Sequence, residues 1–475
     1  MVHAPLSPVS VGELSLERFS TVLEPERYEQ VSEGIERGGP LFAGRTVWNV
    51  SSTARGGGVA EMLSTLLAYA RGAGIDARWE VIGGDSEFFA LTKRIHNRLH
   101  GFDGDGGPLG ERESEGYSRS LSASGAALAA KLRPGDVVIL HDPQTAGLVP
   151  AVLARGVPVV WRCHIGIDRP DERVRDTWGF LLPYVHGADA TVFSRRAFVW
   201  DGLDPARVSI ITPTLDAFAP KNQDLDHATV AAILNVAGLR GGGNGAVPAY
   251  TELGGAIALV ARRARVTEER PMGPDERYVV QVSRWDALKD HGGVMAGFAE
   301  HVAPHSDAHL VCAGPDVEGV SDDPEGAQVL ARLREQWSRL PAGVRERVHL
   351  AVLPMDDWQE NAAMVNALQR GASVVIQKSL AEGFGLTVAE AMWKARPVTA
   401  SAIGGIQDQI EDGRSGLLLA DPGALGPFGD AVSSLLADTA GAQVMGDAAR
   451  ERVRDRFLGP RALLDYLTLL GGLLR

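Results

Sequence analysis

The sequence predicts an α/β protein of two doubly wound domains that face each other across a deep cleft. Its 475 residues suit two or three domains at roughly 100–200 residues each. Short, almost continuously apolar runs alternate with segments of helical periodicity in both halves, which is typical of parallel strands covered by helices on both faces. Polar residues gather where these runs end. Because such sheets bind ligands at the carboxyl ends of their strands, we expect the site there, in the cleft.

Each half of the chain predicts one sheet. The first half has strand-like runs at residues 46–52, 77–84, 132–142, 157–166 and 189–196. A glycine loop follows the first of these runs and leads into a helical segment at 59–74. The second half has strand-like runs at 277–286, 308–316, 347–354, 372–379 and 397–405, with helical segments between most of them. This repeated order of strand, loop and helix favours parallel pairing in both halves.

The domain junction is expected within residues 220–275, where RGGGNGAVP (240–248) cannot form a regular element. We predict an N-terminal domain at 1–265, with an irregular linker insert near 223–265, and a C-terminal domain at 266–455. The apolar segment 456–475 is expected to form a terminal helix that packs back on the body.

The composition argues against several classes of protein. With 47 basic and 60 acidic residues the formal net charge is −13, which disfavours nucleic acid or an anionic membrane as a partner. Cys163 and Cys312 lie far apart in apolar runs and predict small buried side chains rather than a disulfide or metal site. The N-terminus lacks a signal-peptide pattern, and no run of about 20 apolar residues could span a bilayer. We therefore expect a soluble, cytoplasmic protein.

Two cations follow the first strand-like run of the second half. Arg284 comes at the end of QVS, and Lys289 follows five residues later. A planar guanidinium and a compact ammonium at one strand end suit the oxygens of a diphosphate. The alternative is that these side chains form ordinary surface salt bridges with Asp286 and Asp290.

The segment SLAEGFGLTVAEAMW (379–393) predicts an anion site at a helix start. Gly383 and Gly385 let the backbone approach a ligand closely. The amides from Phe384 through Leu386 to Thr387 would be the unpaired donors of the helix, which favour an anion.

Two glutamates flank this helix start. Glu390 would lie about one turn inside the helix, where it can accept hydrogen bonds from a diol such as a ribose. Glu382 would lie in the preceding loop and could bond sugar hydroxyls or face the positive charge of an oxocarbenium-like centre. The alternative is a solvated helix glutamate and a loop carboxylate without a ligand.

The strand ends of the first half also carry polar groups. Gly56 to Gly58 lie between a strand-like run and a helix, but neither G-x-x-x-x-G-K-[ST] nor G-x-G-x-x-G is present. The other polar residues at these strand ends suit a polyhydroxylated ligand; they are His141, Asp142, Gln144, His164 and Asp168. A purely structural role for each of the two histidines stays open. No Ser-His-Asp order, zinc motif or nucleophile elbow is visible in the sequence.

These features together resemble the retaining glycosyltransferases of family four. The resemblance rests on Glu382 with Glu390, Arg284 with Lys289, and the glycine loop at 56–58. Longer blocks across residues 40–470 are similar to the trehalose glycosyltransferring synthases, among them WNVSSTARGGGVAEML, HDPQTAGL, WRCHIGID, PKNQDL and QKSLAEGFGLTVAEAMWKARPV. The resemblance implies the two-Rossmann, B-type glycosyltransferase fold, with an acceptor-side N-terminal domain and a nucleotide-sugar-binding C-terminal domain.

The family also implies an activity. A retaining hexosyltransferase of this kind moves glucose from a nucleoside diphosphate glucose, such as ADP-glucose or UDP-glucose, to free glucose and forms α,α-trehalose reversibly. The expected partners are small sugars and the sugar nucleotide, with no required cofactor; a need for Mg²⁺ and a homodimer stay open. Alternatives are a retaining trehalose phosphorylase, a specialised-metabolite glycosyltransferase with another acceptor, and a catalytically silent sugar- or nucleotide-binding regulator.

The resemblance implies roles for individual residues. The expected catalytic residues are Arg284, Lys289, Glu382 and His164. Donor binding is expected from Gly383, Phe384, Gly385, Leu386, Thr387, Glu390, Gly57 and Gly58. Acceptor binding is expected from Glu61, His141, Asp142, Gln144 and Asp168, and no metal ligand is expected. Ala287 and the segment 213–222 carry alanine where the family pattern favours proline, which leaves the acceptor less defined than the donor.

Overall fold

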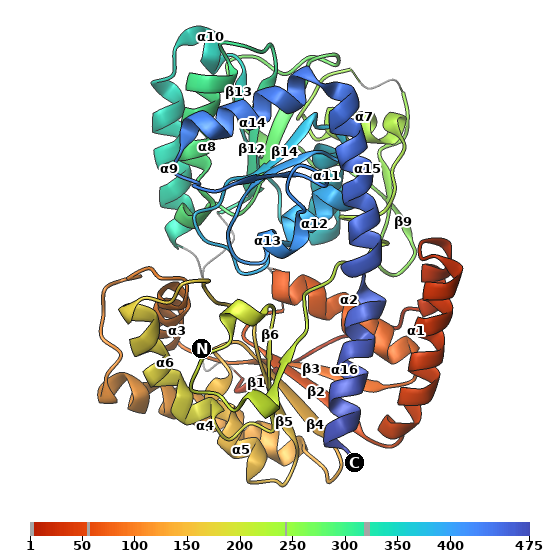
Figure 1. Cartoon of the computed structure of the whole chain (residues 1–475), viewed down its shortest axis with the longest axis vertical. Coiled ribbons are helices and arrows are strands. Elements are labelled where there is room, and N and C mark those ends of the chain that lie inside the picture. The colour runs from red at the N-terminus through yellow and green to blue at the C-terminus, as the bar shows by residue number, and fades with distance from the viewer. Residues whose placement is uncertain (1–3, 55–57, 243–244, 318–323) are drawn as a thin grey trace. The chain divides into compact units, whose positions relative to one another are not determined.

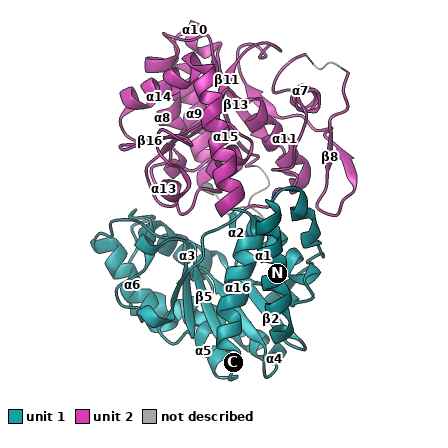
Figure 2. Cartoon of the chain, turned by 45° about the vertical axis from the view of Figure 1, so that its right-hand side comes forward, with its two compact units in different colours: residues 1–214, 457–475 teal, residues 215–456 magenta. Residues whose placement is uncertain are grey.

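The computed structural model describes residues 4–54, 58–242, 245–317 and 324–475 (Figure 1). The chain divides into two compact units (Figure 2). Unit 1 comprises Met1–Thr214 and Phe457–Arg475, and unit 2 comprises Leu215–Arg456. No helix among the described residues is both long and apolar enough to cross a bilayer.

Unit 1 is built on a mainly parallel sheet. Its strands are β1 (Leu6–Val9), β2 (Thr46–Ser51), β3 (Asp76–Ile82), β4 (Val137–His141), β5 (Val159–Cys163), β6 (Ala190–Phe193) and β7 (Val208–Ile210). Within the described residues the sheet order is β1-β3-β2-β4-β5-β6-β7. Only the edge strand β1 pairs antiparallel in this described sheet. Because β2 lies between β3 and β4, the direction of sheet growth reverses between β2 and β4.

Helices pack around this sheet. They are α1 (Pro25–Gly38), α2 (Gly58–Gly72), α3 (Ser86–Leu99), α4 (Glu111–Lys131), α5 (Val149–Leu153), α6 (Glu172–Val185) and α16 (Gly459–Leu473). Aspartates fix two helix starts: Asp85 Oδ1 accepts from Phe88 N at 2.8 Å, and Asp171 Oδ1 accepts from Val174 N at 3.1 Å. The C-terminal helix α16 packs against α1 and α2.

Unit 2 repeats the architecture with another strand order. Its strands are β8 (Ala249–Thr251), β9 (Ile257–Leu259), β10 (Arg265–Thr267), β11 (Tyr278–Val282), β12 (His309–Pro315), β13 (Val348–Leu353), β14 (Val374–Gln377), β15 (Val398–Ser401) and β16 (Leu417–Leu419). In the described part of the chain the main sheet follows β10-β13-β12-β11-β14-β15-β16, and β8 pairs with β9. Without the antiparallel edge strand β10, this is the 3-2-1-4-5-6 order of Rossmann domains.

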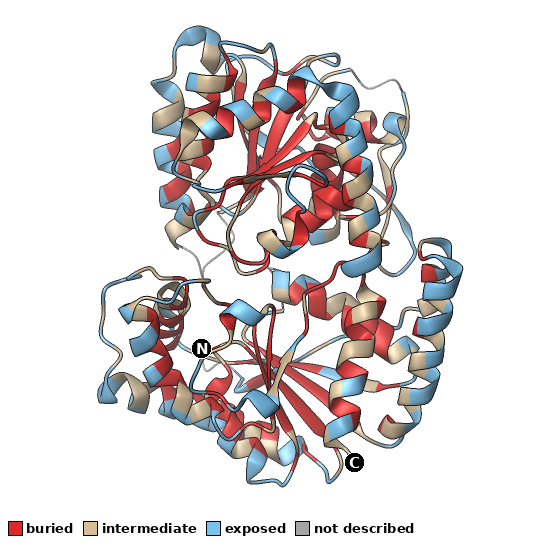
Figure 3. Ribbon diagram, viewed as in Figure 1, coloured by how far each residue is buried: buried red, intermediate tan, exposed pale blue. Residues whose placement is uncertain are grey.

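The helices of unit 2 connect these strands. They are α7 (His227–Val236), α8 (His291–Gly297), α9 (Pro324–Ser338), α10 (Ala342–Arg345), α11 (Trp358–Gly371), α12 (Leu386–Trp393), α13 (Ile406–Gln409), α14 (Leu425–Ala437) and α15 (Thr439–Arg456). In both units the buried residues concentrate in the parallel strands (Figure 3), and every residue of β2, β4, β5 and β11 is buried. The sequence expectation of two doubly wound domains is confirmed.

Residues 215–265 lie in unit 2, whereas the sequence placed the domain boundary at 265/266. The segment is also more regular than the irregular insert expected near 223–265, since it contains α7 and the β8–β9 hairpin. Helix α7 packs against α11, and Asn366 Nδ2 on α11 donates to Pro220 O at 3.0 Å. These long-range contacts attach the segment to unit 2.

The buried hydroxyl of Tyr117 ties α4 to the loop after β4. It donates to Pro143 O and accepts from Gly147 N at 3.0 Å. Replacing Tyr117 with phenylalanine leaves both backbone groups without this partner, so we expect the free energy of unfolding to fall by about 1–3 kcal/mol. Urea unfolding of Tyr117→Phe measures this loss.

The matched control is Tyr28→Phe on α1, because the Tyr28 hydroxyl forms no hydrogen bond with the described residues. This control should change the free energy of unfolding by less than about 0.5 kcal/mol. Equal effects of the two substitutions would contradict the role assigned to Tyr117.

Candidate active site

The strand order of unit 2 brings three predicted residues to one place. Sheet growth reverses between the neighbouring strands β11 and β14, and doubly wound sheets bind ligands at such switch points. Arg284 and Lys289 follow β11, and Glu382 follows β14. Two loops from opposite halves of the sheet thus deliver cations and a carboxylate to the carboxyl end of the switch point.

Lys289 and Glu382 form a close ion pair. Lys289 Nζ lies 2.7 Å from both Glu382 Oε1 and Oε2, and Ser379 Oγ donates to Glu382 Oε2 at 2.9 Å. The two charged side chains are only 14% and 12% exposed. Each charge therefore depends on the other for most of its stabilisation.

A buried glutamine holds the two loops at a fixed spacing. Gln281 on β11 is fully buried, and its Nε2 donates to Lys289 O at 2.6 Å while its Oε1 accepts from Lys378 N at 3.0 Å. Leu380 N also donates to Leu288 O at 2.7 Å. The backbone that carries Lys289 and the backbone that leads to Glu382 are thus joined directly.

Arg284 is the more accessible cation. Its side chain is 46% exposed, and its NH2 group lies 3.3 Å from Asp286 Oδ2. The salt bridge with Asp286 that the sequence left as an alternative is present, and it joins the half-exposed Arg284 to an Asp286 side chain that is only 4% exposed. The alternative for Lys289 is wrong, because Asp290 pairs with the buried Lys378 instead.

The helix start predicted after the glycine turn is formed by α12. Gly385 has φ +81° and is the N-cap of the helix, a conformation that favours glycine. The first amides of α12, including those of Leu386 and Thr387, have no carbonyl partner within the helix. Gly383 O accepts from Gly405 N at 2.8 Å, so the loop of residues 382–385 is held from behind by the loop after β15.

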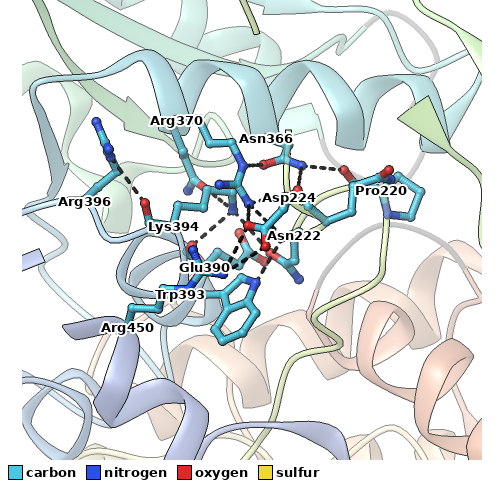
Figure 4. A network of polar contacts seen from close by, with 12 residues as sticks. Pro220, Asn222, Asp224, Asn366, Arg370, Glu390, Trp393, Lys394, Arg396 and Arg450 are labelled. Atoms are coloured by element: carbon cyan, nitrogen blue, oxygen red, sulfur yellow. Dashed lines mark hydrogen bonds and ion pairs between the residues drawn. The ribbon is translucent and has the colours of Figure 1, made fainter. Parts of the chain in front are cut away.

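Glu390 is buried rather than solvated. It is 3% exposed, and its Oε1 lies 3.3 Å from Lys221 Nζ. Glu390 Oε2 has no hydrogen-bond partner among the described residues. Figure 4 shows the polar network around it, in which residues 220–224 meet side chains of α11, α12 and α15. The buried, unpartnered oxygen leaves one acceptor for a ligand hydroxyl.

The sheet of unit 1 also places predicted residues at a switch point, between β2 and β4. Asn49 on β2 and His141 at the end of β4 are in contact, with Asn49 Oδ1 3.1 Å from His141 Nε2. His141 Nδ1 lies 3.3 Å from His164 Nε2, and the two rings stack with centroids 5.6 Å apart. The structure therefore brings the two predicted histidines together.

Both histidines are held neutral. Burial lowers the pKa of His141 to about 3, and the nearby Arg162 guanidinium lowers it further. Burial and Arg162 also lower the pKa of His164 well below its usual value. Arg162 is 1% exposed and donates to Phe193 O and Ser194 Oγ, both at 3.2 Å. Neutral imidazoles can donate to and accept from sugar hydroxyls.

Asp142 lies behind His164. Its Oδ1 accepts from His164 N at 2.7 Å, and its φ of +64° places it in the left-handed region. Burial raises the pKa of the Asp142 carboxyl group to about 7, while the His164 hydrogen bond and Arg162 act to lower it. This carboxyl group orients the loop that carries His164.

The remaining predicted residues of unit 1 are three acceptor residues, Gln144, Asp168 and Glu61, and two donor residues, Gly57 and Gly58. Gln144 Oε1 is buried and has no hydrogen-bond partner among the described residues. Asp168 Oδ1 pairs with Arg195 NH1 at 2.7 Å. Gly58 begins α2, and Glu61 is exposed in its first turn. Gly57 lies outside the described residues.

Sequence reasoning missed several partners of these residues: Asn49, Arg162, Lys221, Lys378 and Ser379. Asn49 carried a signal, because it is a polar residue inside an apolar strand-like run, and buried polar side chains need a partner. Lys221 and Ser379 lie in segments where polar residues are common, and no spacing marks them. In the described part of the chain no three His, Cys, Asp or Glu side chains come together to hold a metal ion.

Comparisons with known proteins define the class. The family model of the trehalose synthase N-terminal domain matches residues 49–200, and that of group 1 glycosyl transferases matches residues 276–438. A trehalose synthase of Rubrobacter xylanophilus is 33% identical over 473 residues, covering 99% of each chain. A trehalose synthase of Pyrococcus horikoshii is 31% identical and covers 98% of each chain.

The chain therefore belongs to the trehalose synthase family of glycosyltransferases, as the sequence predicted. A trehalose phosphorylase of Pleurotus pulmonarius is more distant, at 27% identity over 88% of this chain and 56% of its own length. The expectation of a trehalose-forming hexosyltransferase is confirmed over that alternative.

Solved structures confirm the fold class. A UDP-forming α,α-trehalose-phosphate synthase from Burkholderia vietnamiensis matches with a TM-score of 0.64 and 16% identity, over 91% of this chain and 98% of its own. An Anabaena protein in complex with UDP and glucose matches with a TM-score of 0.59 and 15% identity, over 90% of this chain and 100% of its own. At these identities the likeness defines the B-type glycosyltransferase fold alone.

Replacing Asp142 with asparagine should change how stability depends on pH. The Asp142 pKa of about 7 in the folded state lies above its ordinary value of 3.8. Its contribution to stability is therefore complete below pH 3.8 and is lost as the pH rises towards 7. Asparagine keeps the side-chain oxygen that accepts from His164 N but does not titrate.

We compare the free energies of unfolding of the two proteins, as wild type minus Asp142→Asn. This difference should decrease as the pH rises from about 4 to about 7, by up to about 1.4 kcal/mol per pH unit, and should stay constant at higher pH. Urea unfolding of both proteins across this range measures the difference. A difference that is constant with pH would show that the Asp142 pKa is not raised.

Proposed function

We propose that this trehalose-forming enzyme uses a nucleoside diphosphate glucose as donor and free glucose as acceptor, with retention at the anomeric carbon. The observation that carries the donor assignment is the Lys289–Glu382 pair beside Arg284 at the switch point of unit 2. Structures of similar fold are named as UDP-forming or are in complex with UDP and glucose, which supports a nucleotide donor here.

The diphosphate is the natural ligand of the cations in unit 2. Arg284 contributes a half-exposed guanidinium, Lys289 contributes an ammonium, and the start of α12 contributes unpaired amides and the positive end of the helix dipole. The nucleoside then follows the same helix, so that a ribose hydroxyl can donate to Glu390 Oε2, which is otherwise unpartnered among the described residues.

Donor binding exchanges the partners of an existing ion pair. Lys289 Nζ contacts both carboxylate oxygens of Glu382. A phosphate oxygen that binds Lys289 competes for this ammonium, and Glu382 then accepts from hydroxyls of the donor sugar. Because Ser379 keeps one hydrogen bond to Glu382, the carboxylate stays oriented during the exchange.

The transfer follows a front-face path. The bond from the anomeric carbon to the phosphate oxygen breaks, and the acceptor oxygen bonds to the same face of the sugar. The departing phosphate oxygen takes the acceptor proton, so that the products are a nucleoside diphosphate and α,α-trehalose. No protein side chain has to act as base, which agrees with the low pKa values of His141 and His164.

The residues of unit 1 bind the sugars in this proposal. His164 offers a neutral imidazole nitrogen to a sugar hydroxyl, and Gln144 offers a buried amide oxygen that has no partner in the described chain. Asp142 acts through His164, because its carboxyl group already accepts from the His164 backbone. Asp142 is therefore a positioning residue in this proposal and not a direct acceptor ligand.

Replacing Arg284 or Lys289 with alanine should reduce kcat by about 10²-fold or more, the usual effect of losing one preorganised donor to a developing charge. Steady-state kinetics of the forward reaction measure this effect. Arg339→Ala is the control, since Arg339 is an exposed arginine of unit 2 whose ion-pair partner in the described part of the chain is the exposed Glu335. Near wild-type turnover of both site variants would remove the diphosphate role.

A panel of donors and acceptors tests the function as a whole. The enzyme is incubated with ADP-, UDP- or GDP-glucose and with glucose or other sugars, and the products are identified by NMR for linkage and anomeric configuration. We expect α,α-trehalose from at least one nucleotide donor with glucose. Phosphate-dependent release of glucose 1-phosphate from trehalose without any nucleotide would instead identify a phosphorylase, and a product only with another sugar would overturn the acceptor assignment.

A further inference from the structure

A chain of polar side chains in unit 1 leads to His164. Asn49 lies on β2, His141 ends β4, and His164 follows β5; in the sheet β4 lies between β2 and β5. Asn49 Oδ1 lies 3.1 Å from His141 Nε2, and His141 Nδ1 lies 3.3 Å from His164 Nε2. We call these two contacts the Asn49–His141–His164 relay. Each contact needs one hydrogen between its two atoms, so the relay decides which ring nitrogens are protonated.

Asn49 fixes the direction of this relay. Its side-chain oxygen faces His141 Nε2, and because a carbonyl oxygen can only accept, the hydrogen must belong to His141 Nε2. A neutral imidazole carries one ring hydrogen, so His141 Nδ1 is then an acceptor. The hydrogen of the second contact must therefore come from His164 Nε2. It follows that His164 Nδ1 carries no hydrogen.

The surroundings of the relay favour this single arrangement of hydrogens. Asn49 and His141 are each 2% exposed, so bulk water does not compete for the contact between them. Burial and the Arg162 guanidinium lower the pKa values of both histidines. Neither ring therefore takes up a second hydrogen at neutral pH, and the reasoning for neutral imidazoles holds for both.

His164 Nδ1 is the open end of the relay. His164 is partly exposed, and its Nδ1 forms no hydrogen bond with the described residues. The residue is held at two other points: its backbone N donates to Asp142 Oδ1 at 2.7 Å, and its Nε2 contacts His141. A ring held in this way presents one acceptor nitrogen in a fixed direction.

We propose that Asn49 is a positioning residue that makes His164 Nδ1 a hydrogen-bond acceptor for a sugar hydroxyl. His164 then selects a sugar that donates at this point, and a substituent that only accepts, such as fluorine, binds poorly there. His141 transmits the direction of the relay from Asn49 to His164. The recognition of a sugar rests on the proposed function above, whereas the protonation of His164 does not.

Nitrogen-15 NMR of the full chain with labelled histidine tests the relay without any substrate. The signals of His164 are identified as those that disappear in His164→Gln. At neutral pH we expect His164 to carry its hydrogen on Nε2 and to have a bare Nδ1, whose resonance lies far from that of a protonated ring nitrogen. A hydrogen on His164 Nδ1 in the wild type would overturn the proposal.

Asn49→Leu removes the oxygen that directs the relay and keeps a similar side-chain size. His164 Nδ1 should then be protonated in a measurable fraction of molecules, and kcat/KM for trehalose formation should fall by about fivefold to tenfold, the scale of one hydrogen bond. Thr191→Val is the matched control, because Thr191 is buried in the same sheet and its Oγ1 has no hydrogen-bond partner among the described residues. It should leave the His164 tautomer unchanged and kcat/KM within about twofold. An unchanged His164 tautomer in Asn49→Leu would overturn the role of Asn49.

Deoxyfluoro sugars test the recognition step. Fluorine replaces one hydroxyl at a time in the donor glucose or the acceptor glucose, and the wild type should lose about tenfold or more in kcat/KM at one position. Asn49→Leu should lose less than about threefold at that same position, because its His164 no longer presents a fixed acceptor. If no position is more sensitive in the wild type than in Asn49→Leu, the recognition role is wrong. An enzyme that forms no trehalose from any nucleotide donor would instead overturn the proposed function and leave the NMR result for the relay standing.

Discussion

Parallel strands that are covered on both faces admit few charged side chains along their length, and this constraint decides where most of the chemistry of both units lies. Strands β2, β4, β5 and β11 are buried at every residue. Charged and ligand-binding groups must therefore collect where strands end. At the two switch points, neighbouring loops diverge and leave space. The pairs Asn49–His141 and Lys289–Glu382 lie at these two points.

The same constraint explains which parts of the fold could be predicted. A strand buried on both faces is a continuous apolar run, so the run at 347–354 predicted β13 (Val348–Leu353) to within one residue. The edge strands β1 and β10 are short and partly exposed, so they have no such local pattern and were missed. The place of residues 215–265 in unit 2 depends on distant contacts such as Asn366 with Pro220, which no local pattern encodes.

The candidate site was predictable residue by residue but not pair by pair. Strand ends and a glycine turn are local features, and they were sufficient to select Lys289, Glu382, His141 and His164. That Lys289 pairs with Glu382 and not with its neighbour Asp290 depends on the adjacency of β11 and β14. Strand order is a property of the whole sheet, which a pass along the sequence cannot supply.

The buried ammonium of Lys394 shows how α12 is held in place. Burial lowers its pKa well below the usual value, and the nearby Glu390 acts in the opposite direction. Its Nζ donates to Gln369 Oε1 at 2.7 Å, Glu390 O at 3.1 Å and Asn222 Oδ1 at 3.3 Å (Figure 4). These three acceptors match the three donors of an ammonium group. Apolar replacements of such buried charges are often neutral or stabilising, so stability alone does not explain this lysine. Its three hydrogen bonds instead hold α11, α12 and the segment at Asn222 in fixed positions relative to one another. We infer that it fixes the helix whose first amides and Glu390 are proposed to bind the donor.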